Sequence, residues 1–134
     1  MSDALGLTDP VDFKSEVPVY EQIRRRIQAA IGSGAFAPDD PLPSVRSLAR
    51  SLMVNPNTVM RVYRELELAG VVWSRQGRGV FVTGAARGQC REDGCELVRA
   101  RMREAIELAH RAGIPARELA RLWNEVREER GGTA

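Results

Sequence analysis

Residues 54–70 read VNPNTVMRVYRELELAG, in which residues typical of a helix start precede an apolar run. Asn55 is well suited to cap a helix, and Pro56 fits the first helical position, where its missing N–H costs nothing. Val54 and Val59 occupy the places of a hydrophobic staple. The stretch therefore predicts a helix with an abrupt start.

The predicted helix has two different faces. An apolar stripe with helical spacing comprises Val59, Val62, Leu66 and Ala69. A polar group near the start of another side comprises Asn57, Thr58, Arg61 and Arg64. Asn and Arg can match the edges of adenine and guanine, and the positive end of the helix dipole lies at the same place. We interpret this edge as a surface that meets DNA; an ordinary solvated face is the alternative that the pattern alone leaves open.

Two shorter segments before this stretch also have helical periodicity. The first apolar stripe comprises Tyr20, Ile23, Ile27, Ala30 and Ile31, and the second comprises Val45, Leu48, Ala49 and Leu52. The first helix is expected between Pro18 and Gly34, and the second from Ser44, whose hydroxyl can cap it, to Met53. A helix that begins three residues after another one ends is the helix-turn-helix arrangement.

After Gly70, the β-rich runs VVWS and VFV flank RQGRG, which predicts a β-hairpin. The residues expected to pack one face of it on the helices are Val71, Trp73, Val80 and Val82. Arg75 and Arg78 lie in the turn, where an exposed loop can reach a phosphate or a minor groove. We interpret the hairpin as a wing, with a solvated hairpin as the alternative.

The C-terminal part predicts two more helices. Residues 84–92 lack periodicity and read as a linker, and Asp93 with Glu96 resembles a capping box that opens a fourth helix. Gly113 ends this helix, and Pro115 suits the first turn of a fifth. Helices joined by such a short connection are expected to lie antiparallel.

These two amphipathic helices cannot enclose a core of their own, so they require a partner surface. This partner surface could be the first helix of the same chain or a second copy of the chain, and we favour the second copy. The expected dimer interface comprises Val98, Met102, Ile106, Leu119, Leu122, Trp123 and Val126. Trp123 is expected near its centre, with packing inside the chain as the alternative.

Composition excludes several classes of function. The 134 residues allow one small domain with an appendage, and residues 1–16 read as a mostly loose N-terminal arm. No apolar run approaches a membrane span, and the start has no secretory signal, so we expect a cytoplasmic protein with no membrane contact. Positive charge gathers in residues 17–83, where nine arginines face five acidic residues.

No catalytic, metal or cofactor site is expected. His110 is the only histidine and has no nucleophile near it in a catalytic pattern. Cys90 and Cys95 lack the spacing of a zinc site, and we expect two reduced thiols, with a redox role as the alternative.

The segments VPVYEQIRRRI, LPSVRSLARSL, VNPNTVMRVYRELELAG and RGVFV together resemble, in order and spacing, the GntR family of bacterial transcription regulators. The resemblance covers roughly residues 11–83, and the short two-helix tail resembles the YtrA branch. It implies a mainly α fold with a small β-hairpin. A winged helix-turn-helix DNA-binding domain (17–83) would be followed by a linker (84–92) and a two-helix antiparallel dimerisation tail (93–130).

The residues expected to contact DNA, from the pattern and the resemblance together, are Ser44, Arg46, Asn55, Asn57, Thr58, Arg61, Arg75, Gly77, Arg78 and Gly79. The resemblance gives Tyr63 and Leu66 packing roles. Many family members carry an arginine where this chain has Pro56, so base reading shifts here to Asn57 and Arg61.

The resemblance implies a homodimeric repressor of a small operon, often a neighbouring transporter operon, bound to double-stranded DNA at a pseudo-palindromic operator. An effector, if one exists, is an unknown small molecule expected between the domains or at the dimer seam. The alternative is a winged-helix module that binds protein and not DNA, which would suit the modest net charge of +2.

Overall fold

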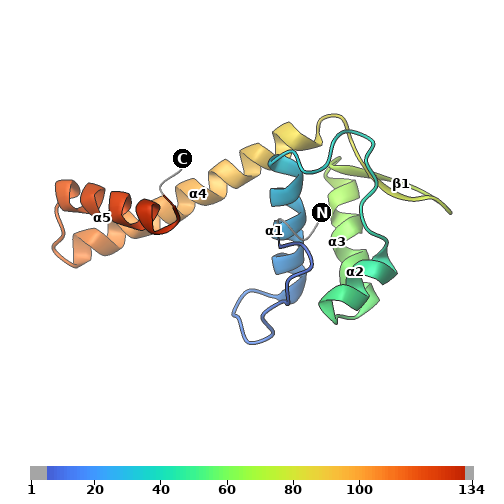
Figure 1. The fold of residues 1–134 in the computed structure, drawn as a ribbon, viewed down its shortest axis with the longest axis horizontal. Helices are drawn as coiled ribbons and strands as arrows, with labels where there is room; N and C mark the ends of the chain where they lie inside the picture. The colour runs from blue at the N-terminus through green and yellow to red at the C-terminus, as the bar shows by residue number, and fades with distance from the viewer. Residues whose placement is uncertain (1–5, 132–134) are drawn as a thin grey trace. The chain divides into compact units, whose positions relative to one another are not determined.

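The computed structural model describes residues 6–131. The elements in this part of the chain are α1 (Val19–Gly32), α2 (Val45–Leu52), α3 (Pro56–Leu68), β1 (Val72–Arg75), β2 (Gly79–Val82), α4 (Ala86–Arg111) and α5 (Ala116–Glu129) (Figure 1). The chain divides between Gly94 and Cys95 into two compact units. The class is mainly α with one small hairpin, as the sequence predicts.

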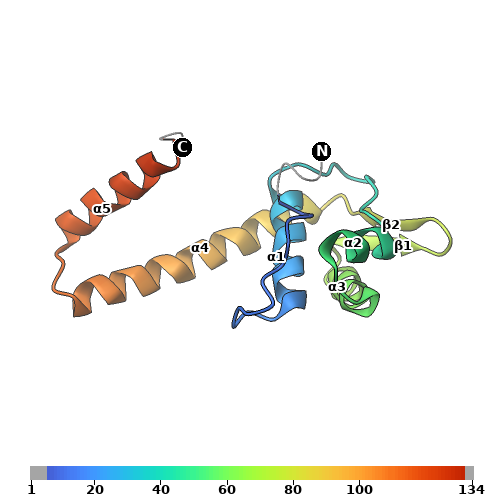
Figure 2. The same cartoon turned by 60° about the horizontal axis from the view of Figure 1, so that its bottom comes forward.

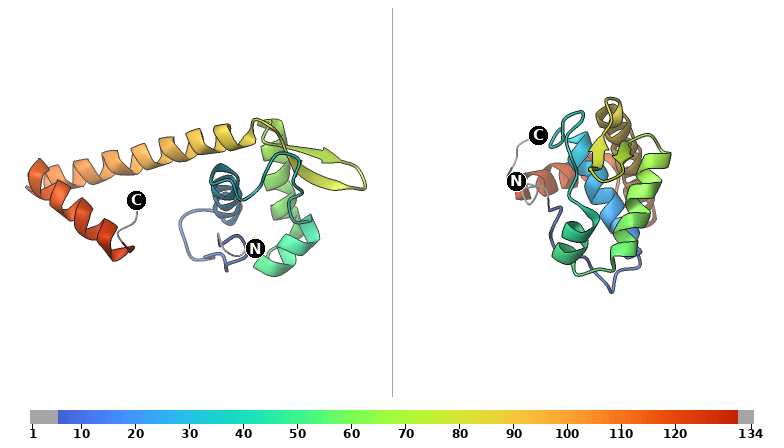
Figure 3. Two further views of the ribbon diagram at one scale, coloured as in Figure 1. Left: turned by 45° about the horizontal axis from the view of Figure 1, so that its top comes forward. Right: turned by 90° about the vertical axis from the view of Figure 1, so that its right-hand side faces the viewer.

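The first unit forms around α3, which packs against both α1 and α2 (Figure 3). Its core is made by the predicted stripes, of which the fully buried members are Ile23, Ile27, Ile31, Leu48, Val59, Val62 and Leu66. Burying a side chain of this size contributes about 1.5–3 kcal/mol. Because one side of α3 is held in this core, its other side faces outward.

Two of the three predicted side-chain N-caps are present, those of α2 and α3. The Asn55 side-chain oxygen accepts a hydrogen bond from the Asn57 N–H at 2.8 Å, and the Ser44 hydroxyl oxygen accepts one from the Ser47 N–H at 3.0 Å. Met53 ends α2 in the left-handed conformation, with φ 57°. The connection from α2 to α3 is therefore short, because Met53 ends α2 and the Asn55 side chain caps the start of α3.

The hairpin pairs Val72 with Val82 and Trp73 with Phe81. Since neighbours along a strand face opposite sides, Val72 and Val82 are buried while Trp73 stacks on Phe81 on the other face, with ring centroids 4.6 Å apart. The prediction that Trp73 packs on the helices with Val82 is therefore wrong. Val71, which is buried as predicted, precedes the strand and does not share its alternation.

Tyr63 fixes the loop that leads into α2. Its ring is buried, and its hydroxyl donates to the Pro43 carbonyl oxygen at 2.6 Å. Burial raises the pKa of this hydroxyl well above its usual range. The packing role that the resemblance implies for Tyr63 agrees with this burial.

The N-terminal arm is not loose in its described part. Leu7 and Val11 are buried in the core of the first unit. Gln22 accepts from the Asp12 N–H at 2.9 Å and donates to the Asp12 carbonyl oxygen at 2.8 Å. The prediction is wrong for residues 6–16, because single apolar residues can anchor a segment that has no periodicity; residues 1–5 lie outside the described part.

Residues 84–92 do not form a linker. Helix α4 begins at Ala86, so Asp93 lies inside it and does not cap it. Ala86 and Cys90 are buried in the core of the first unit, and burial, with the nearby Asp93 carboxylate, raises the pKa of the Cys90 thiol to about 11. The sequence pattern missed the start of α4 because it contacts the core through the small residues Ala86 and Cys90 and not through large apolar side chains.

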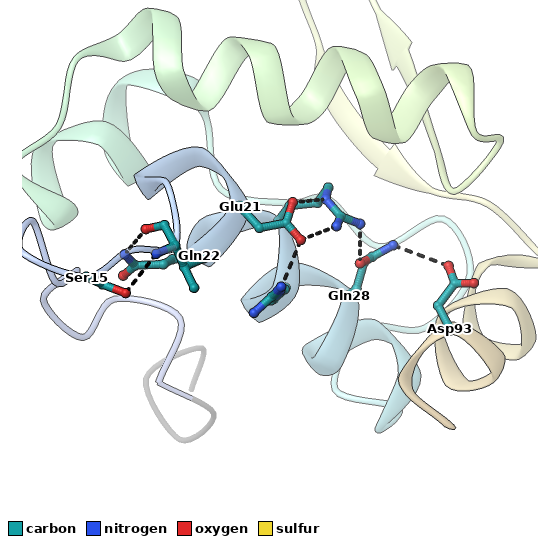
Figure 4. Close-up of polar contacts among 8 residues, drawn as sticks. Ser15, Glu21, Gln22, Gln28 and Asp93 are labelled. Carbon is teal, nitrogen blue, oxygen red and sulfur yellow. Dashed lines mark hydrogen bonds and ion pairs between the residues drawn. The ribbon is translucent and has the colours of Figure 1, made fainter. Parts of the chain in front are cut away.

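The start of α4 lies directly against α1. A Cβ added at Gly32 would lie 3.1 Å from the Arg91 backbone nitrogen. A polar chain also joins the helices, since Glu21 accepts from Arg24, Arg24 donates to Gln28, and Gln28 donates to Asp93 at 3.4 Å (Figure 4). Burial would raise the pKa of Glu21, but the hydrogen bonds and charges of Arg24 and Arg25 lower it below its usual value.

The second unit holds the rest of α4 and α5, joined through Gly113, whose φ is +74° (Figure 2). Most of its apolar stripe residues are exposed in the single chain, whereas Leu119 and Leu122 are half-buried. No residue of α5 is fully buried, and Trp123 is 57% exposed. None of the helices described within residues 6–131 is long and apolar enough to cross a membrane.

The contact at Gly32 predicts opposite effects for two glycine-to-alanine substitutions. Gly32→Ala should lower the free energy of unfolding by about 1–3 kcal/mol, because the added methyl meets backbone atoms of α4 that cannot turn aside. Gly94→Ala, where the same methyl meets nothing within 4 Å, should raise it by about 0.5–1 kcal/mol. Thermal unfolding followed by circular dichroism measures both, and equal shifts would contradict the close packing at Gly32.

The cap at Asn55 predicts a second effect on stability. Asn55→Ala should lower the free energy of unfolding by about 1 kcal/mol, since the Asn57 N–H loses its acceptor. Asn55→Asp keeps an acceptor at the positive end of the helix dipole and should be neutral or stabilising. Urea unfolding curves test the pair; if both variants are destabilised alike, the side-chain cap contributes nothing.

Candidate nucleic-acid interface

The first turns of α3 form one side of a shallow, open hollow of about 390 Å³. Two helices supply its lining, which comprises Val19 and Tyr20 from α1 and Asn55, Asn57, Thr58 and Arg61 from α3. The structure therefore brings together four of the residues predicted to meet DNA. All four remain at the surface, and only Thr58 is half-buried.

Arg61 is held on two sides. Its guanidinium carbon lies 3.6 Å from the centroid of the Tyr20 ring, and its Nε donates to a Glu65 carboxylate oxygen at 3.2 Å. The Arg61 side chain is nevertheless 55% exposed. Its two terminal nitrogens make no hydrogen bond to any residue within 6–131, so both can still donate to a ligand.

The start of α2 adds more positive charge. Ser44 and Arg46 are exposed there, and Arg50 lies one turn further along the helix. The Ser44 hydroxyl oxygen accepts one hydrogen bond in the helix cap, and its O–H can still donate to a ligand. Arg46 and Arg50 form no ion pair with any described residue, which leaves both free to contact an anion.

The wing presents its own pair of cations. Arg75 and Arg78 are exposed in the turn, which is closed by the Arg78 N–H donating to the Arg75 carbonyl oxygen at 2.9 Å. Gly77 and Gly79 have φ of +81° and +116°, a conformation that side-chain-bearing residues rarely adopt. The glycines therefore shape the turn that carries the two arginines.

A carboxylate fixes the wing to α3. Glu67 accepts hydrogen bonds from the Ser74 hydroxyl at 2.7 Å and from the Ser74 N–H at 3.2 Å. The wing tip, with Arg75 and Arg78, lies apart from the start of α3 in Figures 1 and 3. The predicted residues thus form three groups on one unit: the start of α2, the start of α3 and the wing tip.

Sequence reasoning missed two residues of this surface. Tyr20 was assigned to the apolar stripe of α1, yet it is half-buried and its ring face covers Arg61. The only available signal was an aromatic residue in an otherwise aliphatic stripe. Arg50 could have been found from its spacing, because it lies four residues after Arg46 and so shares its helix face.

The chemistry of this surface suits a polyanion with hydrogen-bonding edges. Five arginines without an ion pair among residues 6–131 are exposed on α2, α3 and the wing, and they are Arg46, Arg50, Arg64, Arg75 and Arg78. Amide and guanidinium groups lie beside them at the start of α3. No cluster of potential metal ligands occurs among the described residues.

Known proteins are similar to this chain in sequence and in fold. Residues 19–82 match the family described as bacterial regulatory proteins, gntR family. The transcriptional repressor YtrA of Bacillus subtilis (strain 168) is 35% identical over 118 residues, which are 88% of each chain. A GntR family transcriptional regulator from Listeria monocytogenes has a solved structure with a TM-score of 0.71 and 29% identity, covering 84% of this chain and 98% of its own.

A structure of the AraR DNA-binding domain in complex with operator ORE1 covers 55% of this chain and 90% of its own, with a TM-score of 0.50 and 28% identity. The matched relatives are regulators, which agrees with the expectation that the chain is not an enzyme. The chain belongs to the gntR family of bacterial regulatory proteins, in its YtrA-like branch, and is a transcriptional regulator.

Proposed function

We propose that this regulator is a homodimeric repressor that binds double-stranded DNA at a pseudo-palindromic operator. The start of α3 reads base edges in the major groove, and the start of α2 and the wing contact phosphates or the minor groove. The observation that carries the proposal is the outward-facing edge of Asn57, Thr58 and Arg61, held in place by the buried stripe of the same helix.

The distribution of charge supports DNA as the partner. Five arginines without an ion pair among residues 6–131 lie on α2, α3 and the wing of the first unit, and α3 also carries amide and hydroxyl groups at its surface. Contacts to phosphate make affinity depend steeply on salt, because each neutralised phosphate releases counterions. The net charge of +2 is small for the whole chain, but acidic residues elsewhere offset a local surplus.

The exposed apolar face of the second unit supports a dimer. An open groove of about 410 Å³ is lined by Met102, Ala105, Ile106, Ala116, Leu119, Ala120, Leu122, Trp123 and Val126. Val98 is also exposed beside it on α4. A single chain in water rarely leaves such a continuous apolar surface uncovered. A second copy would bury it, and an effector, if the protein has one, would then lie at this seam.

The alternative function is a winged-helix module that binds protein and not DNA. Glu65 and Glu67 lie on α3 and reduce the positive charge of that helix. The arginines of α2 and the wing, which form no ion pair within residues 6–131, favour DNA over this alternative, and the salt dependence of binding separates the two.

Two arginine variants test whether Arg61 reads base edges while Arg46 contacts phosphate. Duplexes first have to be selected from a random-sequence library, and affinities are then measured by fluorescence anisotropy on the selected and on a scrambled duplex. Arg61→Ala should weaken binding to the selected duplex by about 1–3 kcal/mol and the scrambled one much less. Arg46→Ala should weaken both alike.

Arg117→Ala is the matched control, since this exposed arginine lies on α5 and should leave both affinities unchanged. Affinity for the selected duplex should also fall steeply between 50 and 200 mM salt. Equal losses for Arg61→Ala on both duplexes would remove its assigned role, and affinity that does not change with salt would favour the protein-binding module.

The dimer is tested at Trp123. Trp123→Glu places a charge in the apolar groove and should convert a dimer into a monomer in analytical ultracentrifugation, with helix content unchanged by circular dichroism. Asn124→Glu adds the same charge to the neighbouring exposed residue outside the groove lining and should leave the dimer intact. A wild-type protein that sediments as a monomer at micromolar concentration would contradict the dimer.

A further inference from the structure

Two residues of the hollow, Val19 and Tyr20, have no role in the proposed DNA contacts, and both lie on α1. Tyr20 belongs to the first turn of α1, yet its ring face lies 3.6 Å from the guanidinium carbon of Arg61 on α3. A guanidinium over an aromatic face at this distance is attracted to the ring electrons. No hydrogen bond of the Tyr20 hydroxyl occurs among the described residues, so the contact that Tyr20 makes with Arg61 is through its ring face.

The opposite restraint on Arg61 comes from its own helix. Glu65 lies one turn further along α3 and accepts from Nε at 3.2 Å. Ring and carboxylate together fix the plane of the guanidinium and occupy Nε, while the two terminal nitrogens stay unbound within the described chain. Two parallel N–H donors in one plane match the O6 and N7 acceptors of guanine in the major groove.

We propose that Tyr20 is a positioning residue for sequence reading: its ring, with Glu65, holds Arg61 with its terminal nitrogens aimed at a guanine. The inference rests on the proposed function, because it requires that Arg61 meets a base edge. An arginine side chain loses much rotational freedom when it binds, and a side chain already fixed loses less. The ring therefore raises affinity for the correct sequence without touching the DNA itself.

Three variants separate this role from a structural one. Tyr20→Leu keeps an apolar side chain on α1 and removes the ring, and it should weaken binding to the selected duplex about three- to tenfold while leaving the scrambled duplex unchanged. Tyr20→Phe keeps the ring and should restore wild-type affinity. In an Arg61→Ala background, Tyr20→Leu should have no further effect, because the group it positions is gone.

The same series shows which base is read. On duplexes in which each guanine of the selected half-site is replaced in turn, Tyr20→Leu and Arg61→Ala should lose discrimination at the same single position. Arg117→Ala, on α5 and outside the lining of the hollow, serves as a control that removes side-chain atoms without removing the ring. It should keep that discrimination.

The failures are distinguishable. If Arg61→Ala leaves binding to the selected duplex unchanged, Arg61 is no base reader, and the inference falls with that part of the proposed function. If Arg61→Ala weakens specific binding but Tyr20→Leu does not, only the inference is wrong. Equal losses for Tyr20→Leu on both duplexes, an equal loss for Tyr20→Phe, or tighter specific binding by Tyr20→Leu would each overturn it as well.

Discussion

The structure of the first unit depends on one packing contact, the burial of the apolar stripe of α3 against α1 and α2. Val59, Val62 and Leu66 are removed from water along this stripe. A helix that is held along one side must present the other, and here that side begins with Asn57 and Arg61. The hydrophobic core thus sets the orientation of the polar edge, and the Asn55 cap sets where the edge begins.

The sequence predicted most of this unit because its signals are local. A cap residue, a proline at the first helical position and apolar spacing all act within a few residues, so Ser44, Asn55 and the three stripes could be assigned directly. Contacts between distant segments were not predictable in this way. Leu7 and Val11 join the core from a segment without periodicity, and Ala86 does so from what looked like a linker.

In the candidate site, too, local features could be predicted from the sequence and contacts between distant segments could not. The residues on α3 could be named from their positions along one helix, because three- and four-residue spacing places them together. Tyr20 could not, since its contact with Arg61 depends on how α1 crosses α3. The register of the hairpin could not be predicted either. A shift of one residue in where a strand begins moves every side chain to the other face of the hairpin, and this is why Trp73 lies on the face opposite to the predicted one.

The two units differ in how much of their apolar surface a single chain buries. The first unit encloses an apolar core, although Phe13, Met53 and Leu68 are exposed on it, whereas the second unit exposes Met102, Ile106 and Trp123 along its groove. A second copy of the chain would complete the second unit and would also double the DNA surface of the first. Two weak half-site contacts would then act as one strong contact.

The most direct test of the central claim is hydrogen–deuterium exchange of the full chain with and without a duplex selected for tight binding. If the packing of α3 turns its polar edge to DNA, the duplex should slow exchange in residues 44–50, 55–64 and 75–79 and leave α5 unchanged. A tightly bound duplex that leaves exchange in residues 55–64 unaltered would contradict the account.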